Sequence, residues 1–202
     1  MTEYSPRDYW EKRAKIFQRW EHIRTIRAFL LTPFLKAHLK KNIESIRPES
    51  LLEVGCGPGR LIELYRDVDC VCCVDFSRTM LSRIKSRVQR EGFRNISLFQ
   101  MAAENLGFAD DSMDLVVSAH VLLHVPYSNI DEAVTELTRV TGDYITLVEY
   151  SHPDTERLKT RKTSFHVFAH DYRRLFSEKG LKLVKAEKLP FRTQECLVFR
   201  KP

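Results

Sequence analysis

Three glycines at alternate positions, Gly55, Gly57 and Gly59, have the spacing in this sequence that most directly suggests chemistry. Glycine accepts positive φ angles and has no Cβ, so the chain can turn tightly and a ligand can lie against peptide groups. The apolar residues 50–54 predict a buried strand before the glycines, and a helix is expected from Arg60. A strand, a glycine turn and a helix in this order predict a ligand-binding cradle, with helix N–H groups directed at the ligand.

Asp75 follows a second apolar segment and lies twenty residues after Gly55. Dinucleotide-binding folds place at about this distance a carboxylate that accepts hydrogen bonds from both ribose hydroxyls. The same carboxylate would reject a phosphorylated ribose. The structural alternative is an N-cap for the next helix, although Ser77 can serve equally well. The whole pattern favours the ligand role for Asp75.

Polar side chains lie at the ends of the fourth and fifth strands of the predicted sheet. His120 and His124 come after residues 113–119, and Glu149, Tyr150 and His152 come at the end of the strand over residues 144–149. The carboxyl ends of such strands form the crevice where ligands bind in open α/β folds. Histidine is the expected general base if the substrate presents a hydroxyl or a protonated amine. Each histidine can equally be a satisfied polar residue, and no spacing here matches a metal motif, so no metal is predicted.

The cysteine run at residues 70–73 could be mistaken for a metal or redox site. On a strand, Cys70 and Cys72 face one way and Cys73 the other, so the three thiols cannot converge. We therefore expect core cysteines. Cys56 differs because it lies inside the glycine turn, where a small residue is needed.

Alternating strand and helix patterns continue to the end of the chain. The expected helices cover residues 61–65, 80–90, 130–140 and 171–179, and the expected strands cover residues 50–54, 70–74, 96–100, 113–119, 144–149, 181–188 and 195–199. Five strands separated by helices predict a parallel sheet covered on both faces. The last two strands, joined by a short segment containing Pro190, predict an antiparallel hairpin at the edge. The fold class is therefore α/β, with a doubly wound, mostly parallel sheet of seven strands.

Residues 1–48 are helical in pattern and predict a cap or lid over the domain formed by residues 49–202. Apolar residues recur at spacings of three and four from Trp10 onward, with basic residues on the other side. Pro33 is expected to end or kink this helix, and residues 34–46 predict another. The apolar stripe most simply packs as a lid, and resting on a membrane surface is the alternative.

The chain carries 43% hydrophobic residues and a net charge of +6, with +6 on residues 1–48, −7 on residues 49–150 and +7 on residues 151–202. The basic ends can form a rim for an anionic substrate, a membrane surface or nucleic acid, or can simply be solvated surface. No apolar run is long enough for a membrane span, and the first residues lack the apolar core of a signal peptide. An odd number of cysteines does not indicate a secreted disulfide framework. We therefore expect a cytoplasmic protein.

These motifs resemble those of the class I S-adenosylmethionine-dependent methyltransferases, in particular the small-molecule enzymes related to the ubiquinone and menaquinone methyltransferases. The resemblance covers essentially the whole chain. It is carried by residues 53–60 (EVGCGPGR), by Asp75, by residues 103–106 (AENL) with Phe108 and Asp114, and by residues 121–126 (VLLHVP). The implied fold is Rossmann-like, with a helical cap at the N-terminus.

The resemblance also implies S-adenosyl-L-methionine as the cofactor and a role for each matching residue. Glu53 would orient the ammonium group, and Asp75 would bind the ribose. The implied cofactor-binding set is Glu53, Gly55, Cys56, Gly57, Gly59, Asp75, Phe76, Ala103, Glu104 and Ser118. His124 or His120 would be the base, and the expected substrate-binding residues are Trp10, Glu149, Tyr150, His152 and His166. Many relatives carry Gly-Asp where this chain has Met101-Ala102, which leaves Glu104 or a backbone group for adenine.

The predicted function is methyl transfer from this cofactor to a small-molecule acceptor by in-line displacement, in which alignment of the reacting atoms supplies much of the catalysis. Methylation of RNA or of a protein side chain is the alternative. The exit of the fourth strand lacks the Asn/Asp-Pro-Pro-aromatic loop of amino-directed nucleic-acid enzymes. A non-catalytic cofactor-binding module is a third alternative, against which the intact glycine turn and Asp75 argue.

Overall fold

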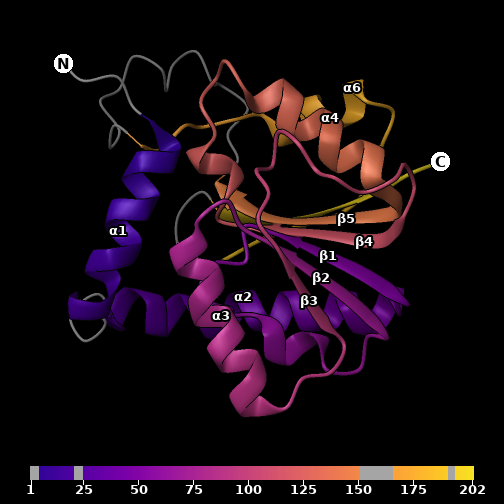
Figure 1. Cartoon of the computed structure of the whole chain (residues 1–202). Coiled ribbons are helices and arrows are strands. Elements are labelled where there is room, and N and C mark those ends of the chain that lie inside the picture. The colour runs from indigo at the N-terminus through magenta and orange to yellow at the C-terminus, as the bar shows by residue number, and fades with distance from the viewer. Residues whose placement is uncertain (1–4, 21–24, 151–165, 191–193) are drawn as a thin grey trace.

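Seven strands form one sheet in the order β3-β2-β1-β4-β5-β7-β6 in this computed structural model (Figure 1). The structure describes residues 5–20, 25–150, 166–190 and 194–202. The strands are β1 (Ser50–Val54), β2 (Cys70–Val74), β3 (Ile96–Phe99), β4 (Met113–Ala119), β5 (Thr141–Tyr150), β6 (Lys182–Lys188) and β7 (Gln194–Arg200). Strands β1 to β5 pair in parallel, and β7 is antiparallel to both β5 and β6. The prediction of a Rossmann-like, mostly parallel sheet with an antiparallel C-terminal hairpin is confirmed.

The sheet order reverses between β1 and β4, which lie side by side although they are far apart in sequence. In open α/β sheets the loops that leave the two strands at such a point diverge, and the space between them binds ligands. Here the loop after β1 is the glycine turn, and the loop after β4 carries His120 and His124. The topology therefore brings the two most informative motifs of the sequence to one edge of the sheet.

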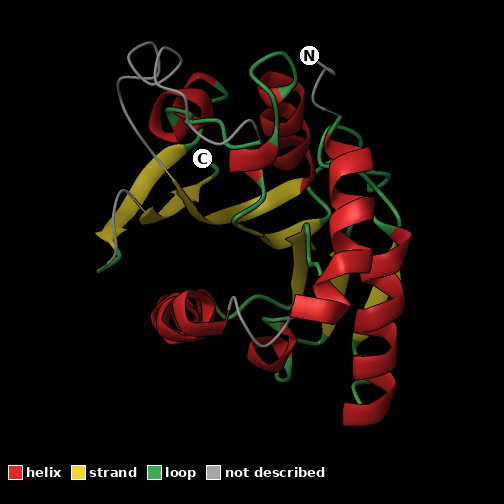
Figure 2. Ribbon diagram, turned by 90° about the vertical axis from the view of Figure 1, so that its left-hand side faces the viewer, coloured by secondary structure: helices red, strands yellow, loops and turns green. Residues whose placement is uncertain are grey.

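Helices cover both faces of the sheet (Figures 1 and 2). One face carries α2 (Thr25–Ile46), the short 3-10 helix η1 (Ile62–Tyr65) and α3 (Arg78–Glu91), and the other carries α4 (Ile130–Val140) and α6 (Tyr172–Glu178). Helix α1 (Pro6–Trp20) stands beside α3 at the side of the sheet (Figure 1). A second 3-10 helix, η2 (Leu122–His124), follows β4.

Local sequence explains the ends of α3. The Ser77 hydroxyl oxygen accepts a hydrogen bond from the Met80 N–H at 3.2 Å, which makes Ser77 the N-cap. Gly92 ends the helix with a φ of +70°, a conformation that glycine adopts without strain. The N-cap alternative for Asp75 is thereby answered, because Ser77 occupies that position.

Two expectations about helices were wrong. Pro33 lies inside α2 and does not end it. The missing proline N–H costs a backbone hydrogen bond, but the turns that follow bury Leu35, Leu39 and Ile43 against the sheet. The chain at Arg60 forms a turn followed by the single 3-10 turn η1, so no α-helix begins directly after the glycines.

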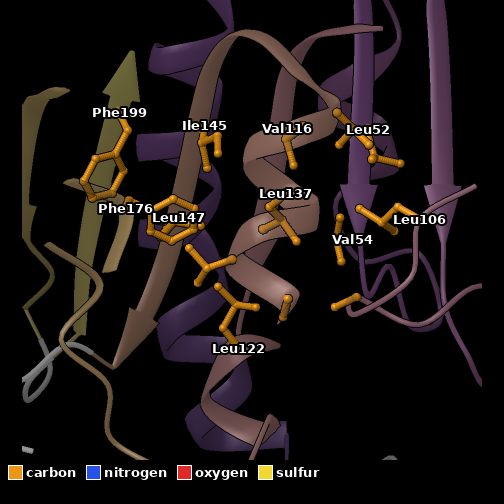
Figure 3. Close-up of a cluster of buried hydrophobic side chains, with 14 of the residues drawn as sticks. Leu52, Val54, Leu106, Val116, Leu122, Leu137, Ile145, Leu147, Phe176 and Phe199 are labelled. Atoms are coloured by element: carbon orange, nitrogen blue, oxygen red, sulfur yellow. The ribbon is translucent and has the colours of Figure 1, made fainter. Parts of the chain in front are cut away.

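The core forms two layers, one on each face of the sheet. Figure 3 shows the layer beneath α4 and α6, where Leu52, Val116 and Ile145 of the sheet meet Leu137 of α4. The Phe176 and Phe199 rings stack there with centroids 5.1 Å apart. Cys72 belongs to this layer and Cys73 to the other, as the alternation along β2 predicts, and the five cysteines are free.

Replacing Phe176 by Ala should lower the free energy of unfolding by roughly 3–5 kcal/mol, because the fully buried ring leaves a cavity beside Phe199. Urea denaturation followed by circular dichroism measures the loss. Val184→Ala is the control, since that side chain is 53% exposed on β6 and should change stability by less than about 1 kcal/mol. Equal losses in the two variants would contradict this description of the core.

Candidate active site

The glycine turn leaves β1 with three positive φ angles, +71° at Gly55, +53° at Gly57 and +80° at Gly59. The Gly55 and Cys56 N–H groups both donate to the Val74 carbonyl, at 2.8 and 3.0 Å. These bonds tie the turn to the carboxyl end of β2. The turn is therefore held in place by the neighbouring strand.

The three glycines are required for different reasons. A Cβ at Gly55 would lie 2.3 Å from Val121 Cγ2, and one at Gly59 would lie 2.7 Å from Ile84 Cγ1. A Cβ at Gly57 would meet no atom within 4 Å. Gly55 and Gly59 are thus needed for close packing, whereas Gly57 borders open space. A ligand can approach the backbone at Gly57.

Asp75 lies directly against this part of the turn. Its Oδ2 accepts the Gly57 N–H at 2.9 Å, and its Oδ1 accepts the Ser77 N–H at 2.8 Å. Burial raises the pKa of Asp75, and the two backbone donors oppose that rise. Each carboxylate oxygen keeps a second lone pair, which can accept a hydroxyl group. The structure therefore brings together the two residues that the sequence singled out first.

Glu53 lies beneath the turn at 3% exposure. Burial raises its pKa to about 8, and the charge of the exposed Arg60 opposes this rise. The Cys73 thiol lies 3.8 Å from Glu53 Oε2 and can donate to it. The Cys56 thiol is also buried. Its contact with Cys73 is the larger cause, and its burial the second, that raises its pKa well above the usual value. Glu53 is the group in this corner that can change charge near neutral pH.

The residues expected around adenine come from two loops. Phe76 follows Asp75, is half-buried, and its carbonyl accepts a hydrogen bond from Gln100 Nε2 at 3.1 Å. Ala103 is buried and Glu104 half-buried in a tight turn that is closed by a bridge between Ala102 and Asn105. The adenine contacts expected of Phe76, Ala103 and Glu104 stay predictions.

The loop after Ala103-Glu104 is held by α4. Glu136 accepts the Leu106 N–H at 2.7 Å, and Arg139 donates to the carbonyls of Leu106 and Phe108 at 2.7 and 2.8 Å. Glu136 and Arg139 also bond each other at 2.7 Å. Sequence reasoning missed this support, although their spacing of three residues on one helix is a recognisable signal for an ion pair.

Glu149 is an internal support for the loop after β4. Its Oε1 accepts hydrogen bonds from the Ser118 hydroxyl and from the N–H groups of Val121 and Leu122, and its Oε2 accepts one from Leu123 N–H. The side chain is 1% exposed, and burial raises its pKa to about 7. The carboxylate predicted to bind substrate, like the Ser118 hydroxyl predicted to bind cofactor, is directed into the protein.

His120 combines backbone strain with an unsatisfied ring nitrogen. Its φ is +60°, and its N–H donates to the Val148 carbonyl at 2.9 Å. The Nε2 atom is buried without a hydrogen-bond partner in the described part of the chain, and the Tyr150 ring centroid lies 6.2 Å from the imidazole. Burial and the Arg60 charge lower its pKa to about 4. Strain of this kind is concentrated at functional sites.

His124 lies in a cluster of rings that joins three segments. Its Nδ1 is 2.7 Å from the His166 carbonyl, and burial lowers its pKa to about 4. The Trp10 ring meets His124 edge-on at 4.6 Å, and the Tyr9 ring stacks on His166 at 4.7 Å. Trp10 and His166, both predicted to bind substrate, are therefore brought to His124. His152 lies outside the described residues.

Glu11 was missed by sequence reasoning. Its Oε2 accepts the Thr79 hydroxyl at 2.9 Å, at the N-terminus of α3 and close to Asp75. No local pattern identifies it, because the contact joins residues 68 positions apart. Across the described ranges, no group of three His, Cys, Asp or Glu side chains could hold a metal ion, and no helix combines the length and hydropathy needed to cross a bilayer.

Residues 51–143 match the family model described as a methyltransferase domain. This match spans the glycine turn, Asp75, residues 103–106 and residues 121–126, and over these residues it supports the resemblance to the class I S-adenosylmethionine-dependent methyltransferases. The chain is 36% identical to the phosphatidylethanolamine N-methyltransferase of Cereibacter sphaeroides over 91 residues, which are 45% of this chain and 44% of that protein. It is 30% identical to a demethylmenaquinone methyltransferase of Leptospira interrogans over 133 residues, 62% of this chain and 53% of that protein.

The chain also has the fold of solved structures. The crystal structure of magnesium protoporphyrin IX methyltransferase from Synechocystis PCC 6803 with bound SAH superposes with a TM-score of 0.75, covering 97% of this chain and 98% of that one. At 17% identity this likeness shows the fold alone. The chain spans about half the length of the curated relatives it matches.

The buried carboxylates and histidines of this chain should affect its free energy of unfolding in opposite ways as pH changes. Glu53 and Glu149 have pKa values raised from 4.5 to about 8 and 7, so the folded protein keeps protons that the unfolded chain releases. Their contribution is full below about pH 4.5 and is lost as pH rises through 7 and 8. His120, His124 and His170 have pKa values lowered from 6.5 to about 4, so their contribution is full above pH 6.5 and is lost as pH falls toward 4.

The free energy of unfolding should therefore be highest near about pH 6 to 6.5 and should fall toward pH 8. Urea denaturation at a series of pH values measures this profile. Glu53→Gln should flatten the decline between about pH 7 and 8, because the amide does not titrate. An unchanged slope in Glu53→Gln would show that Glu53 is not the titrating group.

Proposed function

We propose that this chain transfers a methyl group from S-adenosylmethionine to a small-molecule acceptor. The observation that carries the proposal is the junction of Gly57 and Asp75, where an open backbone position lies against a carboxylate that has spare lone pairs. A ribose diol fits this site, because both hydroxyls can donate to Asp75 while the sugar lies on the peptide at Gly57. When bound, the cofactor supplies a methyl group on a positively charged sulfur.

The other cofactor roles follow from position. Glu53, beneath the turn, would hold the ammonium group, and Phe76 with the Ala103-Glu104 turn would contact adenine. The turn carries no lysine of the kind that holds phosphates in nucleotide hydrolases, which supports a phosphate-free cofactor. Because Glu53 has a pKa of about 8, an ammonium ion placed beside it would favour its ionised form.

The acceptor would lie on the side of the turn that faces His120 and His124. Both imidazoles are neutral at pH 7, since their pKa values are about 4. In His124 the contact of Nδ1 with the His166 carbonyl fixes the proton on Nδ1 and leaves the lone pair on Nε2. Either histidine can therefore take a proton from an acceptor hydroxyl, with Trp10, Tyr150 and His166 forming the surrounding wall.

The acceptor class is supported by the chemistry of this wall and by the relatives. Rings of Tyr9, Trp10, His124 and His166 suit a flat, conjugated acceptor, which they can contact through their faces and edges. The relatives and neighbours described above include a demethylmenaquinone methyltransferase and a magnesium protoporphyrin IX methyltransferase, and quinones and porphyrins are flat, conjugated molecules. The basic ends of the sequence favour an acceptor that carries negative charge.

The proposal is tested by calorimetric titration with S-adenosylhomocysteine. Asp75→Ala should weaken binding by about tenfold or more, because a hydrogen bond to a charged group is worth roughly 1.5–3 kcal/mol. Gly57→Val should weaken binding at least as much, since its side chain would fill the open position. Asp69→Ala is the matched control, an exposed aspartate just before the opposite end of β2. If the wild-type chain gives no binding heat under any condition, the proposal fails.

The base is tested with a panel of phenols, quinols, amines and a short RNA, followed by mass spectrometry for added methyl groups. For an acceptor methylated on a hydroxyl, replacing the histidine that acts as base by Asn should lower kcat by about 10² or more. The Kd for S-adenosylhomocysteine should stay within about threefold, because no cofactor contact is removed. If His120→Asn and His124→Asn both leave kcat unchanged, neither histidine is the base. Methylation of the RNA alone would overturn the small-molecule assignment.

A further inference from the structure

Helix α1 contacts the cofactor half and the acceptor half of the proposed site at the same time. Toward the acceptor half, Trp10 meets His124 and Tyr9 stacks on His166. Toward the cofactor half, Glu11 accepts the Thr79 hydroxyl, and the Ala14 carbonyl accepts Arg83 Nη2 at 2.7 Å. Glu11 and Ala14 lie three residues apart and share one face of the helix. Helix α1 can therefore couple binding in the cofactor half to the arrangement of the acceptor half.

Glu11 occupies the N-terminus of α3 as a carboxylate supplied by another helix. Besides the Thr79 hydroxyl, which donates to Glu11, the Ser77 hydroxyl and the N–H groups of Arg78 and Thr79 favour the ionised form of Glu11. A negative charge at this end of a 14-residue helix is favourable, because the first N–H groups lack partners within the helix. Burial opposes ionisation, but these donors hold the pKa of Glu11 below its usual value.

The same position places Glu11 next to Asp75. Ser77 interacts with both carboxylates, since its N–H donates to Asp75 and its hydroxyl favours the ionised form of Glu11. Burial is the main cause of the raised pKa of Asp75, and the charge of Glu11 adds to it, as expected for two carboxylates at the same helix end. Docking of α1 therefore brings one negative charge toward another at the place proposed for the ribose.

We propose that Glu11 is a positioning residue that couples binding at Asp75 to the docking of α1, so that the acceptor wall at Trp10 is completed after the cofactor has bound. This inference rests on the proposed function. Ribose hydroxyls donating to Asp75 would neutralise part of its repulsion with Glu11 and so favour the docked helix. By thermodynamic reciprocity, the docked helix then favours the bound ligand by the same factor.

The coupling predicts an order of binding. A cofactor that stabilises the docked α1 also fixes Trp10 against His124, and thereby shapes the surface that an acceptor meets. If the acceptor bound first, α1 would be docked less firmly and Trp10 would be less well fixed. The reason is that the repulsion between Glu11 and Asp75 would persist without the cofactor. Glu11 thus affects acceptor recognition without touching the acceptor.

Hydrogen exchange of the full chain, with and without saturating S-adenosylhomocysteine, tests the proposal. In the wild type the ligand should slow exchange of amides in residues 6–20 by about tenfold, within the usual range of coupling between sites. Glu11→Gln keeps an acceptor oxygen for Thr79 but removes the charge, so the ratio of rates without and with ligand should fall toward one. Asp8→Asn removes an exposed charge from the same helix and should keep the wild-type ratio.

Thr79→Val separates coupling from simple anchoring. It removes the hydroxyl donor and leaves the Glu11 charge, so α1 should exchange faster without ligand while the ligand still slows it. If α1 only packs on α3 without coupling, its amides should still exchange faster in Thr79→Val. The ratio of exchange rates without and with ligand should then be the same in Glu11→Gln as in the wild type. A wild-type ratio retained in Glu11→Gln would overturn the coupling.

Exchange in residues 54–60 distinguishes this inference from the proposed function. Protection there by S-adenosylhomocysteine reports binding at the glycine turn itself. If that segment is protected and residues 6–20 are unaffected, the coupling is wrong and the cofactor assignment stands. If neither segment responds and calorimetry shows no binding, the proposed function fails instead.

Discussion

The hydrogen bond from the Gly57 N–H to Asp75 Oδ2 is the interaction on which the site depends. It joins the loop after β1 to the end of β2, and it needs both the left-handed backbone at Gly57 and the parallel register that brings Val54 level with Val74. Any shift of that register would move Asp75 away from the turn. The buried strands are therefore what sets the geometry of the ligand surface.

The rest of the site is held by acidic groups that the fold has taken out of water. Burying a carboxylate is costly unless hydrogen bonds compensate, and Glu149 accepts one from Ser118 of β4 and three from the loop after β4. Removing such a group would leave several buried N–H groups without partners, which is why one internal side chain can decide the shape of the loop that carries His120 and His124. Among the described residues Glu53 has no such set of backbone donors, and burial raises the pKa of both carboxyl groups.

The sheet, the glycine turn and Asp75 could be predicted from the sequence because their signals are local. Strand β4 and helix α4 agree with the sequence expectation residue for residue, since apolar periodicity and flanking polar residues mark their ends. Pro33 was misjudged because the local cost of proline is outweighed by packing of later turns on the sheet. The internal role of Glu149 and the contacts of Glu11 could not be read from the sequence, because they depend on segments about 30 and 68 residues away.

The contrast between local signals and distant contacts also applies to α1. Its position in the site could not be predicted from the sequence. Its helical pattern is local, but its place depends on contacts with distant segments, which include those of Glu11 with Thr79 and Ala14 with Arg83. Contacts of this kind contribute little net free energy each, so ligand binding that changes one of them can shift the docking of the whole helix. Under the coupling proposed above, α1 would respond to the cofactor while the sheet stays fixed. The specificity of the acceptor side would then depend on a helix whose position the cofactor side controls.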